Sequence, residues 1–326
     1  MKKKGKMKGE HMMRNFNVRT DLALEAKEDC DAQKISVRGV SVSEEKDEEK
    51  EIYTTTVKIS TENGAKAMGK PVGTYITIEA PNLSVPDEGY HREISKEVAR
   101  HLKHLIGKEK KSIFVVGLGN HEVTPDALGP EVVGNLHITR HVIREYGELL
   151  LKAKESYEIS SLIPGVMAQT GMETLEIIRG VVRESKPDVM IVIDALAARS
   201  TKRLSRTIQI TDAGIYPGSG IGNHRSGINQ QAIGIPVIAI GVPTVVDAAT
   251  IVNDTMVNLV DAMDQSENLK NLGGTLKTLN REEKYQMIRE LLSPNLNTMF
   301  VTPKDIDETI KRISFTISEG INIAFA

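Results

Sequence analysis

The sequence predicts an α/β protein with a mixed, largely parallel sheet flanked by helices, and with an N-terminal antiparallel β portion that forms a smaller subdomain. Two observations lead to this fold class. Between residues 113 and 263, short apolar runs alternate with helical patterns, which is typical of βαβ units. Between residues 34 and 80, apolar and polar residues alternate with the period of two expected of half-buried strands.

The N-terminal third predicts a leader, a few strands and one long helix. Residues 1–33 are typical of a flexible leader followed by a short charged helix. Three apolar runs then follow, separated by charged or Gly-containing segments, at residues 35–40, 52–59 and 75–78. Residues 91–106 carry apolar side chains at helical spacing, namely Ile94, Val98, Leu102 and Leu105. The weak boundary between the two parts of the chain falls at residues 80–90.

The central region begins with a short apolar strand at residues 113–116. A Gly-Asn loop follows it, and then a helix that starts near Pro125, with Thr124 placed to cap it. Residues 173–184 predict a second helix, and the apolar run at 189–193 predicts a fully buried parallel strand. Further along we expect strands at 207–210 and 236–240 and helices at 244–263, 285–292 and 303–324.

Composition limits the class of protein. The chain has 326 residues and a formal net charge of −2, which gives no electrostatic basis for binding nucleic acid or a membrane surface. Cys30 is the single cysteine, so an internal disulfide is excluded and a reducing cytoplasm fits. No apolar run approaches the roughly 18–20 residues needed to span a bilayer. The basic N-terminus lacks the apolar segment of a secretory signal.

Two strings resemble ligand-binding motifs without matching their chemistry. Gly64 to Lys70 has the spacing of a phosphate-binding loop, but Pro71 stands where Ser or Thr must bind magnesium. His137 and His141 have metal-ligand spacing on a predicted helix, but an isoleucine occupies the position of a zincin's catalytic Glu. We therefore interpret these histidines as surface residues of the helix.

Two aspartates form the strongest candidate site. Asp194 follows directly on the apolar strand at 189–193, and Asp126 lies at the loop-to-helix junction after the strand at 113–116. If both strands belong to one parallel sheet, both carboxylates emerge at its carboxyl end, where open α/β sheets bind ligands. Two carboxyl groups close together titrate as a unit, and such a pair can polarise a peptide carbonyl and activate a water.

Each aspartate also has a simpler interpretation. Asp126 would favour the positive N-terminus of its helix, and Asp194 would cap the segment 195–200. Spacing alone leaves both interpretations open.

Other polar residues are candidates for binding a substrate around this pair. Those in loops are Asn120, Thr124, Gln169 and Ser219, and the cationic ones are Arg199, Arg203 and Arg225. Guanidinium groups would hold an acidic side chain by charge-assisted hydrogen bonds, whereas a solvated basic face is the alternative. The Gly-Ser-Gly string around Ser219 lacks the spacing of a nucleophile elbow, so it predicts a tight loop, and a place for this loop at the site stays open.

Long ordered blocks then identify a resemblance that covers nearly the whole chain. The blocks are residues 18–23, 117–120, 123–130, 164–167, 193–199, 217–220 and 236–247. Together they resemble the germination protease family. The resemblance implies an atypical aspartic endopeptidase, made as a zymogen, that assembles as a tetramer in the cytoplasm of the forespore and spore core. It also implies cleavage of small acid-soluble spore proteins after Glu, with Asp126 and Asp194 as the catalytic residues.

The resemblance also divides the chain. It implies a propeptide at residues 1–17, an N-terminal β-rich portion at 18–85 and an α/β catalytic core with a helical C-terminal part at 86–326. The processing point stays open, with Glu10 and the stretch 15–17 as options. We expect no cofactor, no direct contact with nucleic acid and no membrane contact.

Two departures from the family pattern keep alternatives open. This chain has His121-Glu122 where the family commonly has Trp-Asn, and the segment at about 264–282 is shorter. A second hypothesis therefore places a divalent metal at the same aspartates, with His121, Glu122 or His224, because a metal activates water directly. A third hypothesis is a binding module for spore proteins that has lost catalysis.

Overall fold

One mixed sheet connects the segments that the structure describes. The computed structural model describes residues 20–32, 37–109, 112–147, 157–218, 226–265, 287–288, 290 and 299–325. Within them nine strands form a sheet in the order β1-β2-β3-β7-β8-β6-β4-β5, with β9 paired to β8. The strands are β1 (Val40–Asp47), β2 (Ile52–Ile59), β3 (Gly73–Glu79), β4 (Ser112–Gly117), β5 (Glu158–Leu162), β6 (Val189–Ala198), β7 (Thr207–Thr211), β8 (Val237–Asp247) and β9 (Phe300–Val301).

The sheet has a parallel half and an antiparallel half. β5, β4, β6 and β8 run parallel to one another, whereas β1, β2, β3 and β7 pair antiparallel. β7 joins the halves through antiparallel pairing with β8. The predicted α/β class with a mixed sheet is therefore confirmed. The N-terminal strands extend the same sheet, because β3 pairs with β7 from Tyr75 to Glu79.

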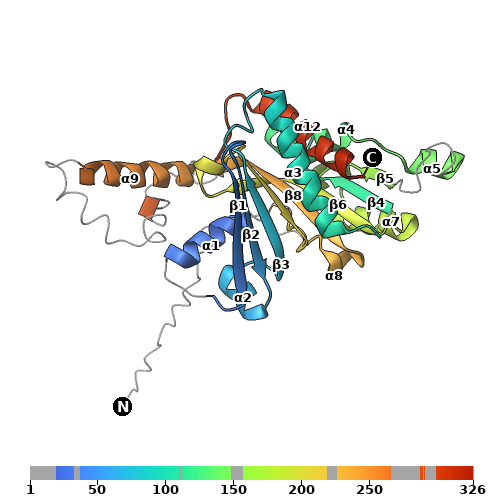
Figure 1. Ribbon diagram of the computed structural model, residues 1–326, viewed down its shortest axis with the longest axis horizontal. Coiled ribbons are helices and arrows are strands. Elements are labelled where there is room, and N and C mark those ends of the chain that lie inside the picture. The colour runs from blue at the N-terminus through green and yellow to red at the C-terminus, as the bar shows by residue number, and fades with distance from the viewer. Residues whose placement is uncertain are drawn as a thin grey trace, which may run out of the picture.

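Helices lie against both faces of the parallel half (Figure 1). One face is covered by α3 (Glu88–Ile106), α4 (Leu128–Gly134) and α12 (Ile306–Phe325), and the other by α7 (Thr174–Ser185) and α8 (Gln230–Ile233). Along β4, Ile113 and Val115 face the first group of helices while Phe114 and Val116 face the second. Because both faces are covered, these strands appear in the sequence as continuous apolar runs.

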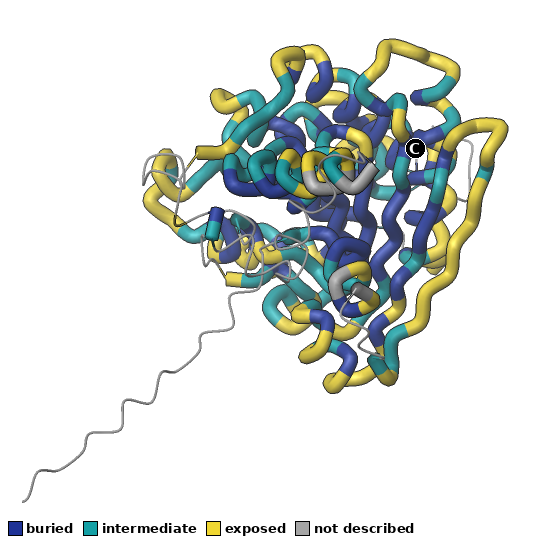
Figure 2. Tube along the Cα trace, turned by 90° about the vertical axis from the view of Figure 1, so that its left-hand side faces the viewer, coloured by how far each residue is buried: buried dark blue, intermediate teal, exposed yellow. Residues whose placement is uncertain are grey.

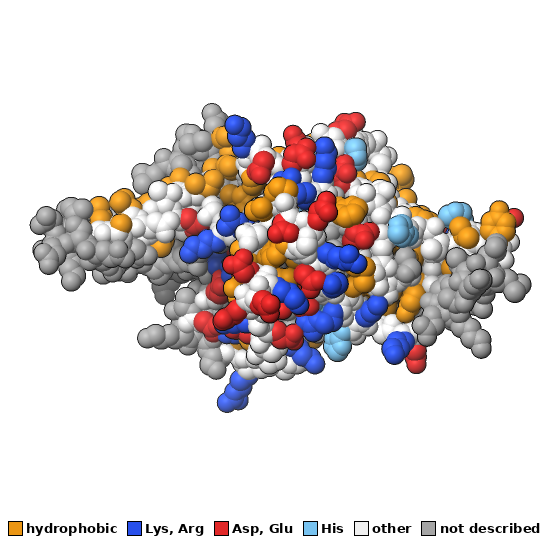
Figure 3. Space-filling model, turned by 45° about the horizontal axis from the view of Figure 1, so that its top comes forward, with side chains coloured by type: hydrophobic (Ala, Val, Ile, Leu, Met, Phe, Trp, Pro, Cys, Tyr) orange, Lys and Arg blue, Asp and Glu red, His pale blue; other side chains and the backbone are white. Residues whose placement is uncertain are grey.

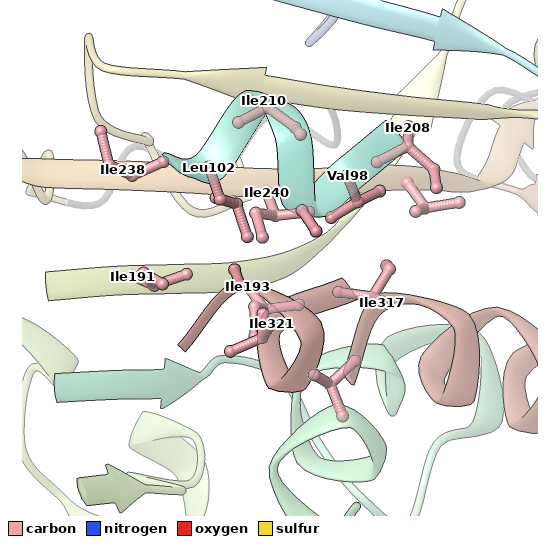
Figure 4. Packing of buried hydrophobic residues seen from close by; sticks show 14 of the residues in the cluster. Val98, Leu102, Ile191, Ile193, Ile208, Ile210, Ile238, Ile240, Ile317 and Ile321 are labelled. Carbon is pink, nitrogen blue, oxygen red and sulfur yellow. The ribbon is translucent and has the colours of Figure 1, made fainter. Parts of the chain in front are cut away.

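The larger core lies between α3, α12 and the sheet (Figure 4). Val98 and Leu102 of α3 and Ile317 of α12 are completely buried there. Burial of each such side chain stabilises the fold by about 1.5–3 kcal/mol. The helix predicted at 91–106 is confirmed and begins earlier, at Glu88, because the Asp87 side chain accepts a hydrogen bond from the Tyr90 N–H at 3.0 Å.

Two strands are longer than their apolar runs predicted. β6 continues past residue 193 to Ala198, and β8 continues to Asp247, where a helix was predicted from residue 244. The two strands pair with each other as far as Ala198 and Val246, so ladder hydrogen bonds extend them. The following helix, α9 (Ala248–Gln265), therefore starts later than predicted. Asp194 lies inside a strand and does not cap the segment 195–200.

Other differences occur where local sequence was misleading. The helix predicted from Pro125 is a 3₁₀ turn, η1 (Thr124–Asp126), and no side chain caps it or α4, so Thr124 is not a helix cap. The strand predicted at 35–40 overlaps β1 only at Val40, and residues 35–36 lie outside the described residues. β1 continues to Asp47 through exposed, mostly polar side chains, which a search for apolar runs does not detect. His137 precedes the helix α5 (Arg140–Tyr146), so only His141 lies on it.

Short polar elements escaped prediction altogether. β5 is an edge strand of five residues with two serines, and α2 (Glu62–Met68) is a two-turn helix capped by Thr61. The helix predicted before residue 33 is α1 (Ala23–Ala32). The remaining short helices are α6 (Met167–Thr170) and η2 (Thr201–Arg203). The predicted propeptide 1–17 lies outside the described residues, as does most of the predicted helix at 285–292.

The surface shows how the sheet edge is protected. Figure 2 shows buried strands at the centre of the sheet and an exposed strand along one edge, which matches the exposure of β1. Charged side chains on β1 discourage pairing with another chain. On the face seen in Figure 3, acidic and basic side chains are interspersed. Among the surface ion pairs, Glu93 binds both Lys50 and Lys96. Among the described helices, none combines the length and apolar character required to cross a membrane.

Candidate active site

Asp126 and Asp194 line the same cavity, which has a volume of about 380 Å³. The cavity lies where β4 ends beside β6, at the carboxyl end of the parallel strands. Its walls come from the loop after β4, the loop after β5, the second half of β6 and the segment after β7, where Pro217 and Gly218 contribute. The topology therefore brings together two residues that are 68 positions apart in the sequence.

Asp194 occupies the point at which β6 extends beyond its neighbour. The last pair between β4 and β6 is Gly117 with Ile193, and the Leu118 N–H donates to the Ile193 carbonyl at 2.8 Å. Asp194 comes next, still paired with Gly241 of β8 but facing the loop that follows β4. The residue is 6% exposed, and its Oδ1 accepts a hydrogen bond from the Ala195 N–H at 3.0 Å.

Asp126 closes the loop after β4. Its Oδ2 accepts a hydrogen bond from the Asn120 N–H at 2.8 Å, and its own N–H donates to the Val123 carbonyl at 2.7 Å. Gly119 makes this closure possible, because it has φ +113° and a Cβ there would lie 1.9 Å from the Asp126 carbonyl oxygen. The loop conformation thus fixes the half-buried carboxylate of Asp126 toward the cavity.

This arrangement can carry out acid–base chemistry. Two carboxyl groups that approach each other closely disfavour double ionisation, and such a pair titrates as a unit. The protonated group can donate to a carbonyl oxygen while the charged group accepts a proton from water. Both roles need groups held by the backbone, as Asp126 and Asp194 are.

Three of the predicted polar residues lie in the loops around Asp126. The Gln169 Nε2 donates to the Asn120 Oδ1 at 3.4 Å, and Asn120 in turn holds Asp126 through its backbone N–H. Thr124 opens the 3₁₀ turn η1, between Val123 and Pro125, which line the cavity. Asn120, Thr124 and Gln169 are not among the described residues that line the cavity, although each lies next to residues that do.

Arg199 and Arg203 lie away from the cavity and bind α1. The Arg199 backbone N–H donates to Glu25 at 3.0 Å, and the guanidinium group of Arg199 donates to the Glu25 carbonyl at 3.2 Å. Arg203 forms ion pairs with Glu28 and Glu79. Although burial lowers the pKa of Arg203, these carboxylates raise it by more, so the net pKa is raised. Ser219 and Arg225 lie outside the described residues.

The role of Arg203 in stability can be measured directly. Arg203→Gln should lower the free energy of unfolding by about 3 kcal/mol, because it removes the cation from three carboxylates, of which Glu25 is fully buried. Urea denaturation measures the effect, and the exposed neighbour provides the control Lys202→Gln, which should change stability by less than about 0.5 kcal/mol. Equal stabilities of the two variants would contradict a structural role for Arg203.

The described residues do not fit a metal site. The His121 ring is largely exposed and lies 3.3 Å from Glu131, and neither His121 nor Glu122 lines the cavity. Within the described part of the chain, no group of three His, Cys, Asp or Glu side chains lies close enough to hold a metal ion. His224 is outside these residues.

Sequence reasoning missed a third carboxylate in the cavity, that of Asp21. The block at residues 18–23 contained this aspartate, but it indicated only where the mature chain begins. No spacing rule connects Asp21 with β6, because their contact depends on how the chain returns to the sheet some 170 residues later.

Comparison with known proteins identifies the chain as an endopeptidase. The family model described as germination protease matches residues 18–268 and 260–326. A germination protease of Caldanaerobacter subterraneus subsp. tengcongensis is 50% identical over 311 residues, with 95% of this chain and 94% of that protein covered. One of Clostridium perfringens is 47% identical over 312 residues, with 95% of each chain covered. The chain belongs to the germination protease family, as its sequence blocks indicated.

More distant proteins complete the comparison. A germination protease of Priestia megaterium is 38% identical over 361 residues, with 98% of this chain and 96% of that protein covered. Among solved structures, a [NiFe] hydrogenase maturation protease, HycI, of Thermococcus kodakarensis is 18% identical, with 44% of this chain and 80% of that chain covered and a TM-score of 0.27.

Proposed function

We propose that this germination protease cleaves small acid-soluble spore proteins after Glu residues, and that Asp126 and Asp194 are its catalytic pair. The observation that carries the proposal is the shared cavity, which Asp126 lines from the turn η1 after β4 and Asp194 lines from the neighbouring parallel strand β6. A substrate carbonyl in this cavity would receive a proton from one carboxyl group. The other would take a proton from the attacking water.

The proposed preference for Glu requires a cation near the cleaved bond. Arg199 and Arg203 bind Glu25 and Glu28 of α1. Among the described residues that line the cavity there is no Lys or Arg. We therefore assign the substrate carboxylate to Arg225, seven residues after the cavity-lining Gly218. An Arg–carboxylate pair is the strongest charge-assisted contact available for this purpose.

Assembly and location are part of the same proposal. The protein would act as a homotetramer in the spore core, where its substrates lie. Support for contact between copies comes from α9, which extends away from the sheet in Figure 1 and exposes Val257 and Leu259. The mass of the particle in solution tests this assembly.

We also propose that residues 1–17 hold the enzyme inactive until they are removed. A chain that starts at Val18 should therefore cleave a small acid-soluble spore protein at once, whereas the full chain should cleave it only after a lag. Intact-mass spectrometry checks both the timing and the C-terminal Glu of each fragment. Equal initial rates would contradict the propeptide, and fragments ending in other residues would contradict the Glu preference.

The same assay separates the alternatives. Full activity after dialysis against a strong chelator supports the carboxylate pair alone. Activity that is lost on dialysis and restored by a divalent metal supports the metal hypothesis. If the full chain and the chain that starts at Val18 both form stable complexes with uncut substrate, the protein is a binding module.

A further inference from the structure

The first described residues of the chain run beside β6, just beyond Asp194. The Asp21 N–H donates to the Ala197 carbonyl at 3.4 Å, and the Ala197 N–H donates to the Asp21 Oδ2 at 3.0 Å. Leu22 is completely buried in a small cluster with Leu196 and Ala198. Asp21 therefore binds Ala197 of β6 twice, once through its backbone N–H and once through its carboxylate.

This contact supplies partners for a strand edge that would otherwise lack them. β4 ends at Gly117, opposite Ile193, so the second half of β6 has no neighbouring strand on that side. Buried N–H and C=O groups on such an edge need hydrogen-bond partners. Asp21 provides both at Ala197, where the β6–β8 pairing shifts its register between Leu196 and Ala197.

Two other elements hold Asp21 and the residues next to it. The Gln209 Nε2 donates to the Asp21 carbonyl at 3.2 Å, and the Gln209 Oε1 accepts from the Ala23 N–H at 2.7 Å. Lys70 donates to the Thr20 carbonyl at 2.8 Å. These contacts come from β7 and from the segment after α2, so the position of Asp21 is set by the folded sheet.

A second anchor lies one helical turn further along. Glu25 is completely buried and accepts hydrogen bonds from the N–H groups of Arg199 and Ser200, at 3.0 and 3.1 Å. Thr20 also donates to Glu25. Asp21 therefore binds the part of β6 that lines the cavity, whereas Glu25 binds the residues that follow β6.

We propose that Asp21 is a positioning residue of the active site, which holds residues 195–197 of β6 and thereby the orientation of the Asp194 carboxylate. The inference rests on the proposed role of Asp194. The Asp194 Oδ1 accepts from the Ala195 N–H, so a shift of Ala195 moves the reacting group. A misplacement of about 1 Å can lower the rate about 10²-fold.

The position of Ala195 is consistent with this role. It is the single partly exposed residue of β6, and it lines the cavity between Asp194 and the segment that Asp21 holds. A substrate in the cavity therefore meets β6 at the stretch whose backbone depends on Asp21.

The test compares Asp21→Ala with Asp21→Asn in the full chain, with the processed fraction determined by intact mass. Asp21→Ala should lower kcat about 10²-fold with KM within about twofold. Asp21→Asn keeps an oxygen that can accept from the Ala197 N–H, so it should recover most of kcat. Asp31→Asn on the exposed part of α1 is the matched control and should behave as the wild type.

Thermal unfolding of each variant and the activity of Asp194→Asn complete the experiment. An unchanged kcat in Asp21→Ala overturns the inference. It is also overturned if Asp21→Ala loses activity together with stability and Asp21→Asn does not recover the activity. If Asp194→Asn remains active, the catalytic pair itself is wrong. If Asp194→Asn is inactive while Asp21→Ala is normal, only the positioning role fails.

Discussion

Asp194→Asn should lower kcat/KM for a small acid-soluble spore protein by about 10³-fold. Asparagine has nearly the same shape, and its side-chain oxygen can still accept the hydrogen bond from the Ala195 N–H that Asp194 now receives. The fold of β6 should therefore persist, while the amide can neither take up nor release the proton that hydrolysis requires. Initial rates from intact-mass spectrometry measure the effect.

A control exists at the opposite end of the same strand. Asp188 precedes β6 and accepts a hydrogen bond from the Ser112 N–H at 2.9 Å, far from the cavity. Asp188→Asn makes the same chemical change and should leave kcat/KM within about twofold of the wild type. A rate for Asp194→Asn equal to that of Asp188→Asn would remove Asp194 from the mechanism and leave the family assignment intact.

The pairing of Asp126 with Asp194 could be predicted because one rule of topology sufficed. Parallel strands end on the same edge of their sheet, and both aspartates follow buried apolar runs. The rule predicted correctly that both aspartates lie at the carboxyl end of the parallel strands. It placed Asp194 after its strand, but β6 continues to Ala198. Apolar runs indicate where a strand is buried on both faces, but pairing with a neighbour decides where it ends.

Side chains whose partners are distant in sequence could not be assigned in the same way. Arg199 and Arg203 follow β6, the strand that carries Asp194, so their positions suggested a substrate-binding cluster. Their partners, Glu25 and Glu28, lie about 175 residues earlier and bind them in the folded protein. A charged residue near a site serves the substrate only if the fold leaves it without an internal partner. Sequence spacing carries no information on that condition.

Gly119→Ala should have the second large effect, on stability and activity together. Gly119 has φ +113°, which residues with a side chain rarely adopt, and its added Cβ would lie 1.9 Å from the Asp126 carbonyl oxygen. Strain and overlap with backbone atoms should lower the free energy of unfolding by about 3 kcal/mol. Because the clash is with Asp126 itself, the loop must move the carboxylate, and cleavage should be nearly abolished.

The same substitution at Gly180 separates this effect from a general response to alanine. Gly180 lies within α7, and no atom lies within 4 Å of a Cβ added there. Gly180→Ala should therefore raise the free energy of unfolding by about 0.5–1 kcal/mol and leave cleavage unchanged. If Gly119→Ala were as stable and as active as Gly180→Ala, the loop after β4 would tolerate another conformation. The close contact between Gly119 and Asp126 would then not be what fixes the Asp126 carboxylate.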